Sequence, residues 1–363
     1  MPRISVLIPI YNGSRFLADT LTSLKAQIMR DFEVLCLDDC STDDSRAIVE
    51  KFSAEDSRFR PIFGDRNRGS VPPVLNEAMP HVRGEYLVYS SQDDTFSADW
   101  LERMLDRAEV TGADAVLPDV VFIDGASRQN HTLFGLHGDR SRVLTNRQAV
   151  EASLDWSIHG WALLRSSLVK SLGYATFCSS ADEYSTRLFM LSANKVAFSK
   201  GIFFSRQDNP DAITKKLTYR IFNAPLVSLA VHDLMTDHEF SREVCATQLL
   251  RSINHLLGYS RLAVRQRKHL GARDAALAAG DLAWAYDQVS PRRMTRLFFR
   301  YFSEYRWKSL VKLFLFSVFN RFLRYATVFS LTGKLGGFDH GNRAQSMELD
   351  KAPLANTASN ALG

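Results

Sequence analysis

Short apolar runs alternate with helix-like patterns through the first 120 residues. We expect a strand at 4–8, ended by Pro9, and then a helix whose apolar face carries Leu17, Leu21, Leu24 and Ile28. The same alternation predicts strands at 33–38, 59–63, 85–90 and 115–117, and helices at 43–54, 70–80 and 99–108. Strands and helices in this order are typical of right-handed βαβ units and a parallel sheet covered on both faces. The predicted fold class is α/β.

The pattern changes twice along the rest of the chain. Residues 120–205 are less regular, with Gly, His and Ser among strand-like pieces, and we expect them to extend the same sheet. Beyond about 215 the strand patterns end and helical patterns dominate. We therefore predict a domain at 1–215, a helical region at 216–338 and a tail at 339–363. The tail is rich in Ala, Asn and Ser, a composition typical of disorder.

The positive charge of the chain is concentrated in one segment. Residues 292–334 hold ten Lys and Arg and one acid, which makes this segment +9. Because the whole chain carries +5, the remainder carries −4. The basic segment is also rich in aromatic residues. We therefore expect a partner attracted by the positive charge to bind this segment rather than the rest of the chain. It contains no recognisable nucleic-acid-binding module, and we expect no nucleic-acid partner.

Cysteine usage and the N-terminus restrict the class of protein further. The four cysteines form no CxxC or Cys/His ligand pattern, which favours a reducing compartment and disfavours a zinc site. The chain enters a strand pattern at Ile4, so we expect no signal peptide. No run of about 18 apolar residues occurs, so we expect no membrane-spanning helix.

Acidic pairs stand where two of the expected strands end. Asp38 and Asp39 follow the second strand, and Asp93 and Asp94 follow the fourth. Strand carboxyl ends converge on one crevice of an open parallel sheet, which is where ligands bind. Carboxylates gathered there repel one another unless a cation or a hydrogen-bond donor lies among them. A divalent metal that carries a diphosphate would supply both, so the two pairs suggest a nucleotide site.

Five segments form one ordered set along the chain. They are Val6–Asn12, Leu37–Asp43, Asn67–Gly69 with Asn76, Gly84–Asp94 and Ala181–Arg187. Together they resemble glycosyltransferase family 2, inverting enzymes with a Rossmann-like GT-A domain that binds a nucleotide-sugar. The resemblance covers about residues 1–215, well over half of the chain. There is no GxGxxG or GxxxxGK[ST] motif, so a backbone phosphate cradle is not supported.

The resemblance implies a role for most of these residues in holding the nucleotide. The segment Pro9, Ile10 and Tyr11 would pack around the base, and Asp39 would accept a hydrogen bond from it. The residues implied on the ribose and phosphate side are Asn67, Gly69 and Asn76.

The resemblance also implies a metal site. Asp93 and Asp94 match a DxD-like motif, in which Asp93 contacts the donor and Asp94 holds Mg²⁺ or Mn²⁺ against the diphosphate. Ser91 stands where the family often has a further acid, so a single metal-binding carboxylate is the simpler expectation. Breaking a sugar–diphosphate bond builds negative charge that a hard cation stabilises, and Mg²⁺ uses one or two carboxylates plus phosphate oxygens.

An inverting transferase also needs a base for the acceptor hydroxyl. By resemblance this is Asp182, at the start of a helix, with Glu183 as the neighbouring alternative. An acid at a helix N-terminus stays ionised because the helix dipole favours negative charge there.

Each acidic group also has a simpler structural interpretation. Asp38 and Asp39 could begin a turn and cap the next helix, and Asp38 is the member more suited to that. Asp93 and Asp94 could cap the helix near residue 97, although other residues there can do so. Trp156, His159 and Trp161 are candidates for the acceptor pocket or for the core. The segment 207–210 is most economically a turn.

The C-terminal segment predicts an amphipathic helix. Ser317, Asn320, Arg321 and Arg324 form one polar stripe between 313 and 326, and apolar residues fill the rest. Such a helix with basic flanks suits an anionic lipid surface, with the polar stripe facing headgroups. The alternative is a helix packed on the catalytic domain.

These patterns combine into one functional hypothesis. The chain would be a metal-dependent inverting glycosyltransferase that moves a sugar from a nucleotide-sugar, UDP-linked, to a glycan or lipid-linked acceptor of a surface polysaccharide. It would work in the cytoplasm, peripheral on the inner membrane face through residues 292–334. The alternatives are a sugar-1-phosphate nucleotidyltransferase and a non-catalytic, membrane-associated nucleotide-binding scaffold.

Overall fold

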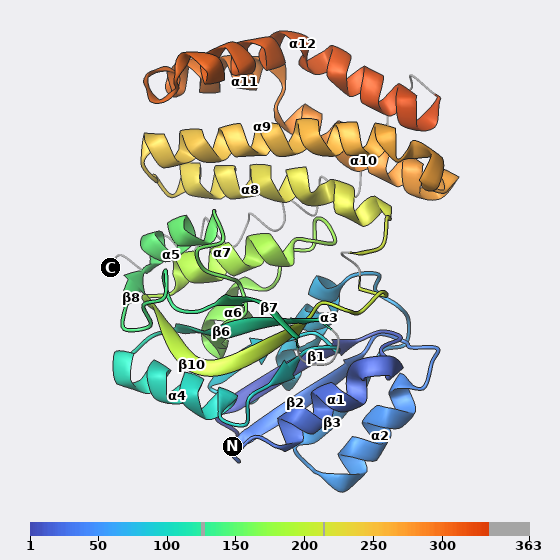
Figure 1. Cartoon of the computed structure of the whole chain (residues 1–363), viewed down its shortest axis with the longest axis vertical. Coiled ribbons are helices and arrows are strands. Elements are labelled where there is room, and N and C mark those ends of the chain that lie inside the picture. The colour runs from blue at the N-terminus through green and yellow to red at the C-terminus, as the bar shows by residue number, and fades with distance from the viewer. Residues whose placement is uncertain (125–127, 213–214, 334–363) are drawn as a thin grey trace. The chain divides into compact units, whose positions relative to one another are not determined.

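The protein is divided into two compact units (Figure 1). A computed structural model describes residues 1–124, 128–212 and 215–333. The first unit comprises Met1–Tyr174 and Ser185–Asn209, and the second comprises Ala175–Tyr184 and the chain from Pro210 onward. The sequence prediction placed its boundary at 215 and did not separate 175–184. The tail predicted at 339–363 lies outside the described residues.

The first unit is built on one ten-stranded sheet. Its strands are β1 (Ile4–Ile10), β2 (Phe32–Asp38), β3 (Phe59–Phe63), β4 (Tyr86–Tyr89), β5 (Thr95–Phe96), β6 (Ala115–Asp124), β7 (Arg128–Leu133), β8 (Val143–Thr145), β9 (Leu163–Arg165) and β10 (Lys195–Arg206). They are ordered β3-β2-β1-β4-β9-β6-β10-β5, with β7 beside β6 and β8 beside β10. The prediction that residues 120–205 extend the same sheet is confirmed.

The sheet is mixed, and the parallel arrangement predicted from the first 120 residues holds for only part of it. The strands β3, β2, β1 and β4 are parallel to one another, and β10 is parallel to β6. The strands β5, β7, β8 and β9 pair antiparallel with their neighbours. A parallel pair needs a crossover of a dozen or more residues. Only a few residues separate β6 from β7, so these two can pair only in the antiparallel sense.

Pro9 does not end β1, contrary to the sequence prediction. Its neighbour β2 continues to pair with β1 as far as Ile10. On the other side, the pairing of β1 with β4 ends at Leu7, whose carbonyl accepts from Ser90 N at 3.1 Å. Residues two apart point to the same neighbour, so the missing N–H of Pro9 faces the side where β4 has already ended.

Helices cover both faces of this sheet. Those of the first unit are α1 (Ser14–Lys25), α2 (Ser45–Glu55), α3 (Val71–Ala78), η1 (Met79–His81), α4 (Trp100–Thr111), α5 (Asn146–Ser153) and α6 (Ser166–Leu172), and α7 (Asp182–Ser192) spans the division between the units. The helices α1, α2 and α4 pack on one face through a core that includes Leu17, Val49 and Trp100. The helices α3 and α6 contact the central strands as well. Ile28 is 51% exposed, so its predicted place on the buried face is wrong; α1 has already ended at Lys25.

From Tyr219 onward the named elements of the second unit are all helices, as the sequence predicted. Its elements are η3 (Tyr219–Asn223), α8 (Ala224–Asp237), α9 (Arg242–Arg265), η4 (Arg267–His269), α10 (Ala272–Gln288), α11 (Pro291–Arg300), η5 (Phe302–Glu304) and α12 (Trp307–Thr332). Within it, α8, α9 and α10 pack together, and α12 lies on α10, α11 and α9 (Figure 1). Among the helices described, none is both long and apolar enough to cross a membrane.

Candidate active site

The acidic pairs lie at the same edge of the sheet, as the sequence predicted. The strands β2, β1 and β4 are adjacent and parallel, so their carboxyl ends meet there. Two residues just beyond these ends adopt positive φ without being glycine: Asn12 at 50° and Cys40 at 62°. Such conformations cost energy and cluster at functional sites.

Side-chain hydrogen bonds connect the three segments that leave these strands. Gln92 accepts from Tyr11 N at 2.9 Å and donates to Tyr11 O at 3.1 Å. Ser41 Oγ accepts from Asn12 N at 3.0 Å, and Asn12 Oδ1 accepts from Thr42 N at 2.7 Å. The sequence gives no sign of this role for Gln92, because a side-chain hydrogen bond to the main chain leaves no periodic pattern.

Asp39 is a buried acceptor in the loop that follows β2. Both of its carboxylate oxygens accept from Arg68 N, at 2.8 and 2.9 Å, and only 8% of the residue is exposed. Burial raises the pKa of the Asp39 carboxyl, and the main-chain N–H of Arg68 counteracts part of that rise. A carboxylate has about four lone-pair sites, so Asp39 retains the capacity to accept from a ligand.

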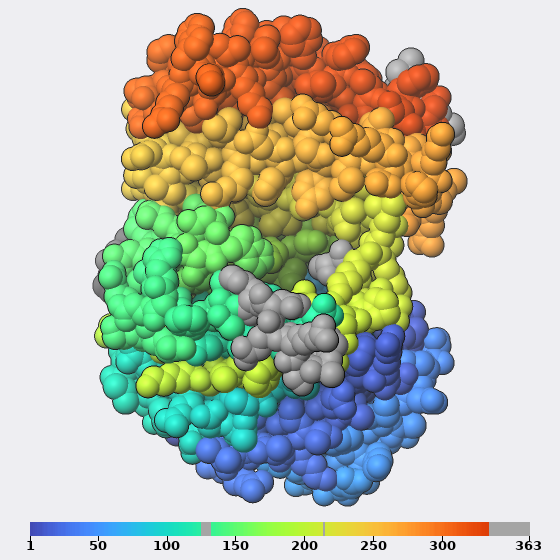
Figure 2. All heavy atoms as spheres, in the orientation of Figure 1, coloured from blue at the N-terminus to red at the C-terminus, as the bar shows by residue number. Residues whose placement is uncertain are grey.

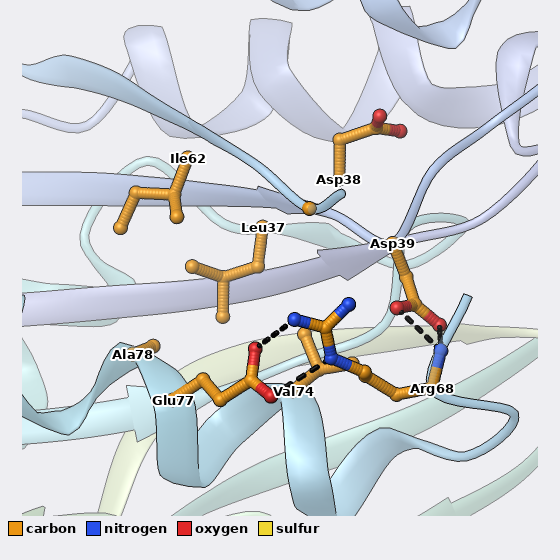
Figure 3. A pocket seen from close by; sticks show the side chains of 9 residues that line it. Leu37, Asp38, Asp39, Ile62, Arg68, Val74, Glu77 and Ala78 are labelled. Atoms are coloured by element: carbon orange, nitrogen blue, oxygen red, sulfur yellow. Dashed lines mark hydrogen bonds and ion pairs between the residues drawn. The ribbon is translucent and has the colours of Figure 1, made fainter. Parts of the chain in front are cut away.

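Arg68 joins Asp39 to α3 beside a small pocket (Figure 3). Its guanidinium donates to both oxygens of Glu77 at 2.8 Å and to Asp65 at 2.7 Å. Those two carboxylates raise the pKa of Arg68, Glu77 more than Asp65. The pocket is lined by Leu37, Asp38, Asp39, Ile62, Gly64, Arg68, Val74, Glu77 and Ala78. Arg68 and Glu77 thus hold the N–H that donates to Asp39; Arg68 lies within the Asn67–Gly69 motif, but the sequence assigned neither residue a role.

Two of the three residues expected near the ribose and phosphates shape this loop. Asn67 donates to Asp39 O at 3.3 Å and accepts from Gly69 N at 2.7 Å. Gly69 has φ 79°, which only glycine adopts at little cost. Asn76 is different, because its amide donates to Tyr174 O and accepts from Tyr174 N, both at 2.7 Å. This pairing fixes the Asn76 side chain against the protein main chain, and its expected place beside the ligand stays a prediction.

The residues expected around the base differ in exposure. Tyr11 is 47% exposed and Pro9 is half-buried. Ile10 is 1% exposed, and its side chain belongs to the core between the sheet and the helices. Alternate residues of a strand face opposite sides of the sheet, so Ile10 follows Ile8 into that core. That the segment Pro9, Ile10 and Tyr11 packs around a base stays a prediction, in which the buried Ile10 side chain would not take part.

Asp93 and Asp94 are held by the segment that ends β10. Asn209 Nδ2 donates to Asp93 Oδ2 at 2.6 Å, and Arg206 N donates to Asp94 Oδ1 at 3.0 Å. The Arg206 side chain donates to Asp93 O at 3.0 Å and stacks over the ring of Phe16 at 4.4 Å. The segment expected to be a simple turn at 207–210 therefore supplies Asn209 to the acidic pair.

Asp94 is buried more deeply than its place at a strand end suggested. It is 4% exposed, and its pKa is raised to about 8, first by burial and then by the neighbouring charge of Asp93. The Ser91 hydroxyl and Arg206 N hydrogen-bond its carboxylate and lower the pKa in part. The hydrogen bonds and the positive charge of Arg206 lower the pKa of Asp94 by less than burial raises it.

This donor set fits a divalent cation that brings its own further ligands. Among the described residues, no group of three or more His, Cys, Asp and Glu side chains is arranged to hold a metal. Mg²⁺ and Mn²⁺ prefer oxygen ligands, and Mg²⁺ usually takes one or two carboxylates together with phosphate oxygens. Asp94, with Asp93 beside it, would hold the ion, and a bound diphosphate would complete its shell. A cation would also favour the ionised form of Asp94.

The acidic pairs could instead have been turn residues or helix caps, and this holds for only one of the four residues. Asp38 Oδ2 accepts from Ser41 N at 3.3 Å, as in a turn, but the residue that precedes α2 is Asp44. Asp99 is the residue that precedes α4, and Ser97 hydrogen-bonds it at 2.7 Å. Asp93 and Asp94 therefore do not cap that helix.

The expected base stands where the sequence placed it, at a helix start. Asp182 is the first residue of α7 and Glu183 the second, and both are half-buried. Asp182 belongs to the second unit, whereas Asp39, Asp93 and Asp94 belong to the first.

The aromatic acceptor candidates separate into surface and core. Trp156 is 51% exposed, and its φ is 64°. Trp161 stacks on Phe203 with ring centroids 5.1 Å apart, and it packs against the core. His159 is 5% exposed, its Nε2 lies 2.8 Å from Pro118 O, and burial lowers its pKa to about 4. His159 and Trp161 are part of the packing rather than of an open pocket.

Comparison with known proteins shows which family this chain resembles. The family model described as "Glycosyl transferase family 2" matches residues 5–173. Glycosyltransferase GlyG of Streptococcus pneumoniae is 25% identical over 209 residues, which cover 54% of this chain and 67% of that protein. The putative teichuronic acid biosynthesis glycosyltransferase TuaG of Bacillus subtilis is 31% identical over 105 residues, or 29% of this chain and 41% of TuaG.

The fold of this chain is shared with a solved structure over nearly the whole length of both chains. The structure of S. aureus TarS 1–349 in complex with UDP-GlcNAc superimposes with a TM-score of 0.63 and 17% identity, covering 92% of this chain and 91% of that one. The α/β, Rossmann-like GT-A fold expected from the sequence is therefore confirmed. Residues 5–173, just under half of the chain, match glycosyltransferase family 2, and this match together with the relatives supports a glycosyltransferase.

Proposed function

We propose that this chain is an inverting, divalent-cation-dependent enzyme that transfers a sugar from a UDP-sugar to a hydroxyl of a glycan or lipid-linked acceptor in surface-polysaccharide synthesis. The donor class is supported by the fold shared with TarS, whose structure holds UDP-GlcNAc. The process is supported by TuaG and by the succinoglycan biosynthesis protein ExoO of Rhizobium meliloti, which is 34% identical over 129 residues. ExoO matches over 35% of this chain and 36% of its own length.

One observation carries the metal and donor part of the proposal. Asp94 is a buried carboxylate at the carboxyl edge of the sheet, adjacent to Asp93, with a pKa raised to about 8. Two acids kept together in that position suit a site in which a cation is delivered with the substrate. When bound, Mg²⁺ or Mn²⁺ would stabilise the negative charge that develops on the departing diphosphate.

The residues of the chain have separate tasks in the proposed reaction. Asp39, oriented by the N–H of Arg68, accepts a hydrogen bond from the base and fixes the donor. The acceptor oxygen forms a bond to the anomeric carbon while the bond from that carbon to the diphosphate oxygen breaks, and its electrons leave with UDP. Asp182 takes the proton of the acceptor hydroxyl. A base so placed contributes roughly 10²–10⁴ in rate.

A donor screen tests the proposal. The full chain is incubated with a panel of nucleotide-sugars and Mn²⁺, and released nucleoside diphosphate is measured with and without EDTA. We expect release from a UDP-sugar that stops when EDTA removes the metal. Release that is unaffected by EDTA would overturn the metal requirement, and release only from a GDP-sugar would overturn the choice of UDP.

A second incubation, with a nucleoside triphosphate and a sugar 1-phosphate, and a UDP-binding measurement separate the alternatives named from the sequence. A sugar-1-phosphate nucleotidyltransferase would produce pyrophosphate from a nucleoside triphosphate, which the proposed enzyme would not. A scaffold would bind UDP without turnover. The family assignment favours the transferase over both. The cytoplasmic location remains a prediction that fractionation of cells can test.

A further inference from the structure

The helix α12 is packed by one side only. Its buried residues are Leu310, Leu313, Phe316, Asn320, Thr327, Val328 and Leu331. A stripe of apolar side chains stays exposed along its length, each 36% to 77% exposed: Trp307, Val311, Phe314, Leu315, Val318, Phe319, Phe322, Tyr325 and Phe329. We call these nine residues the aromatic face. Figure 2 shows α11 and α12, in orange to red, as a continuous outer surface of the second unit.

Two residues of the polar stripe on α12 are placed differently from the sequence prediction. Asn320, expected at a lipid headgroup, is 2% exposed and donates to Val289 O at 3.0 Å. Arg324, from the same expected stripe, pairs with Asp287 at 2.8 Å. The end of α10 leaves a carbonyl and a carboxylate that need donors, and these two side chains supply them. Asn320 and Arg324 therefore face the helical unit, whereas Arg321 is exposed and the nine residues of the aromatic face point outward.

The aromatic face has a basic border. Lys308 and Arg321 lie beside it on α12, and Arg292, Arg296 and Arg306 are exposed on and after α11. None of these five side chains has an ion-pair partner within the part of the chain that the structure describes. Between residues 291 and 333 the only acidic residue is Glu304. A large apolar patch with a rim of one charge is unusual on a protein surface and marks an interaction site.

We propose that the aromatic face lies on an anionic lipid bilayer, with its rings at the boundary between headgroups and acyl chains. A helix with a broad apolar face and basic flanks binds in the plane of such an interface. The five border residues would then contact anionic headgroups. A second copy of the chain is a poorer occupant, because two such faces would bring like-charged borders together. This inference does not depend on Asp94, Asp182 or the donor.

Vesicle binding by the full chain tests this inference. Protein is sedimented with vesicles of phosphatidylcholine alone, and with vesicles that also contain phosphatidylglycerol, at low and high salt. We expect binding to the anionic vesicles, weaker binding as salt screens the charges, and little binding to phosphatidylcholine alone. Equal binding to both vesicle types, or none to anionic vesicles at low salt, would overturn the proposal.

Two double variants and two controls assign the binding to the aromatic face. The variant Phe314→Ser with Phe322→Ser should lower the partition coefficient about tenfold or more for each ring removed. Lys308→Gln with Arg321→Gln should lower it by about 25-fold, or about fivefold for each charge. Val110→Ser removes an apolar residue that is 82% exposed in the first unit, and Lys51→Glu reverses an exposed charge there. Both controls should bind as the unchanged protein does.

If a second copy of the chain covers the aromatic face instead of lipid, the measurements will differ. If the aromatic face joins two copies, sedimentation of the protein alone will show a dimer that Phe314→Ser with Phe322→Ser dissociates, and this outcome would overturn the lipid assignment. Nucleoside diphosphate release from the donor, measured without vesicles in the presence of a water-soluble acceptor, reports on the proposed enzyme independently. A protein that turns over donor but ignores vesicles would refute only the membrane inference.

Discussion

The side-chain amide of Asn209 donates a 2.6 Å hydrogen bond to Asp93, 116 residues earlier in the chain. Three residues before Asn209, the main-chain N–H of Arg206 does the same for Asp94 at 3.0 Å. The end of β10 thus orients both acids that follow β4. A segment that the sequence presents as a turn is therefore a positioning element of the proposed donor site.

Replacing Asp94 by Asn should remove metal-dependent turnover and leave the fold intact. The amide oxygen can still accept from Arg206 N, while the negative charge that would hold the cation is lost. We expect nucleoside diphosphate release to fall by roughly 10²-fold or more, since a cation contributes several kcal/mol to such a step. Asp106→Asn, a matched change at an exposed position on α4, should have no effect. Near-normal activity of Asp94→Asn that still needs Mn²⁺ would exclude Asp94 as the ligand.

Replacing Asp39 by Ala should weaken nucleotide binding. Without Asp39, an N–H group of the nucleotide base would be buried without a hydrogen-bond acceptor. Such a group costs about 1–3 kcal/mol, and we expect the binding free energy to weaken by that amount. Calorimetric titration with UDP and Mn²⁺ measures it, and Asp44→Ala, two residues beyond the Cys40-Ser41-Thr42 turn, serves as the control. An unchanged dissociation constant in Asp39→Ala would mean that Asp39 only orders the loop through Arg68.

Asp182→Asn should lower kcat by roughly 10²–10⁴ with little change in donor affinity, as expected when a base is lost. Glu183→Gln is the matched variant at the next position of α7. If Glu183→Gln is inactive and Asp182→Asn retains activity, the base is Glu183 and our assignment is wrong by one residue.

His159 should make the first unit less stable in mild acid. Burial lowers its pKa from 6.5 to about 4, so between these values the unfolded chain binds a proton that the folded protein does not. The stabilisation is complete above pH 6.5 and decreases as the pH falls toward 4. Its full size is about 3 kcal/mol, an order-of-magnitude value.

Urea unfolding between pH 4 and 7 measures this contribution. His159→Gln can still donate to Pro118 O, and its free energy of unfolding should decrease less on acidification than that of the unchanged protein. His81→Gln, at an exposed position, should behave like the unchanged protein. Parallel pH profiles for all three proteins would contradict the buried, neutral state of His159.

Local patterns were enough to predict much of the first unit. The apolar periods and the turns between them predicted β1 to β4 and α1 to α4 in order, because these elements bury one face or alternate faces. The acidic pairs could be placed at a common edge because parallel neighbouring strands end on the same side. The motifs from Val6–Asn12 to Gly84–Asp94 were then sufficient to indicate the family.

Only the tertiary structure decided which side chains meet. The amide of Asn76 is bound to Tyr174, and Asp93 is bound by Asn209, through contacts between residues about a hundred positions apart. No local period records such pairs, since they depend on the register of distant strands. The sequence determined that α12 has a polar and an apolar side. Which side faces out was decided by Asp287 and the Val289 carbonyl, because a buried polar group that lacks a partner costs more than an exposed ring.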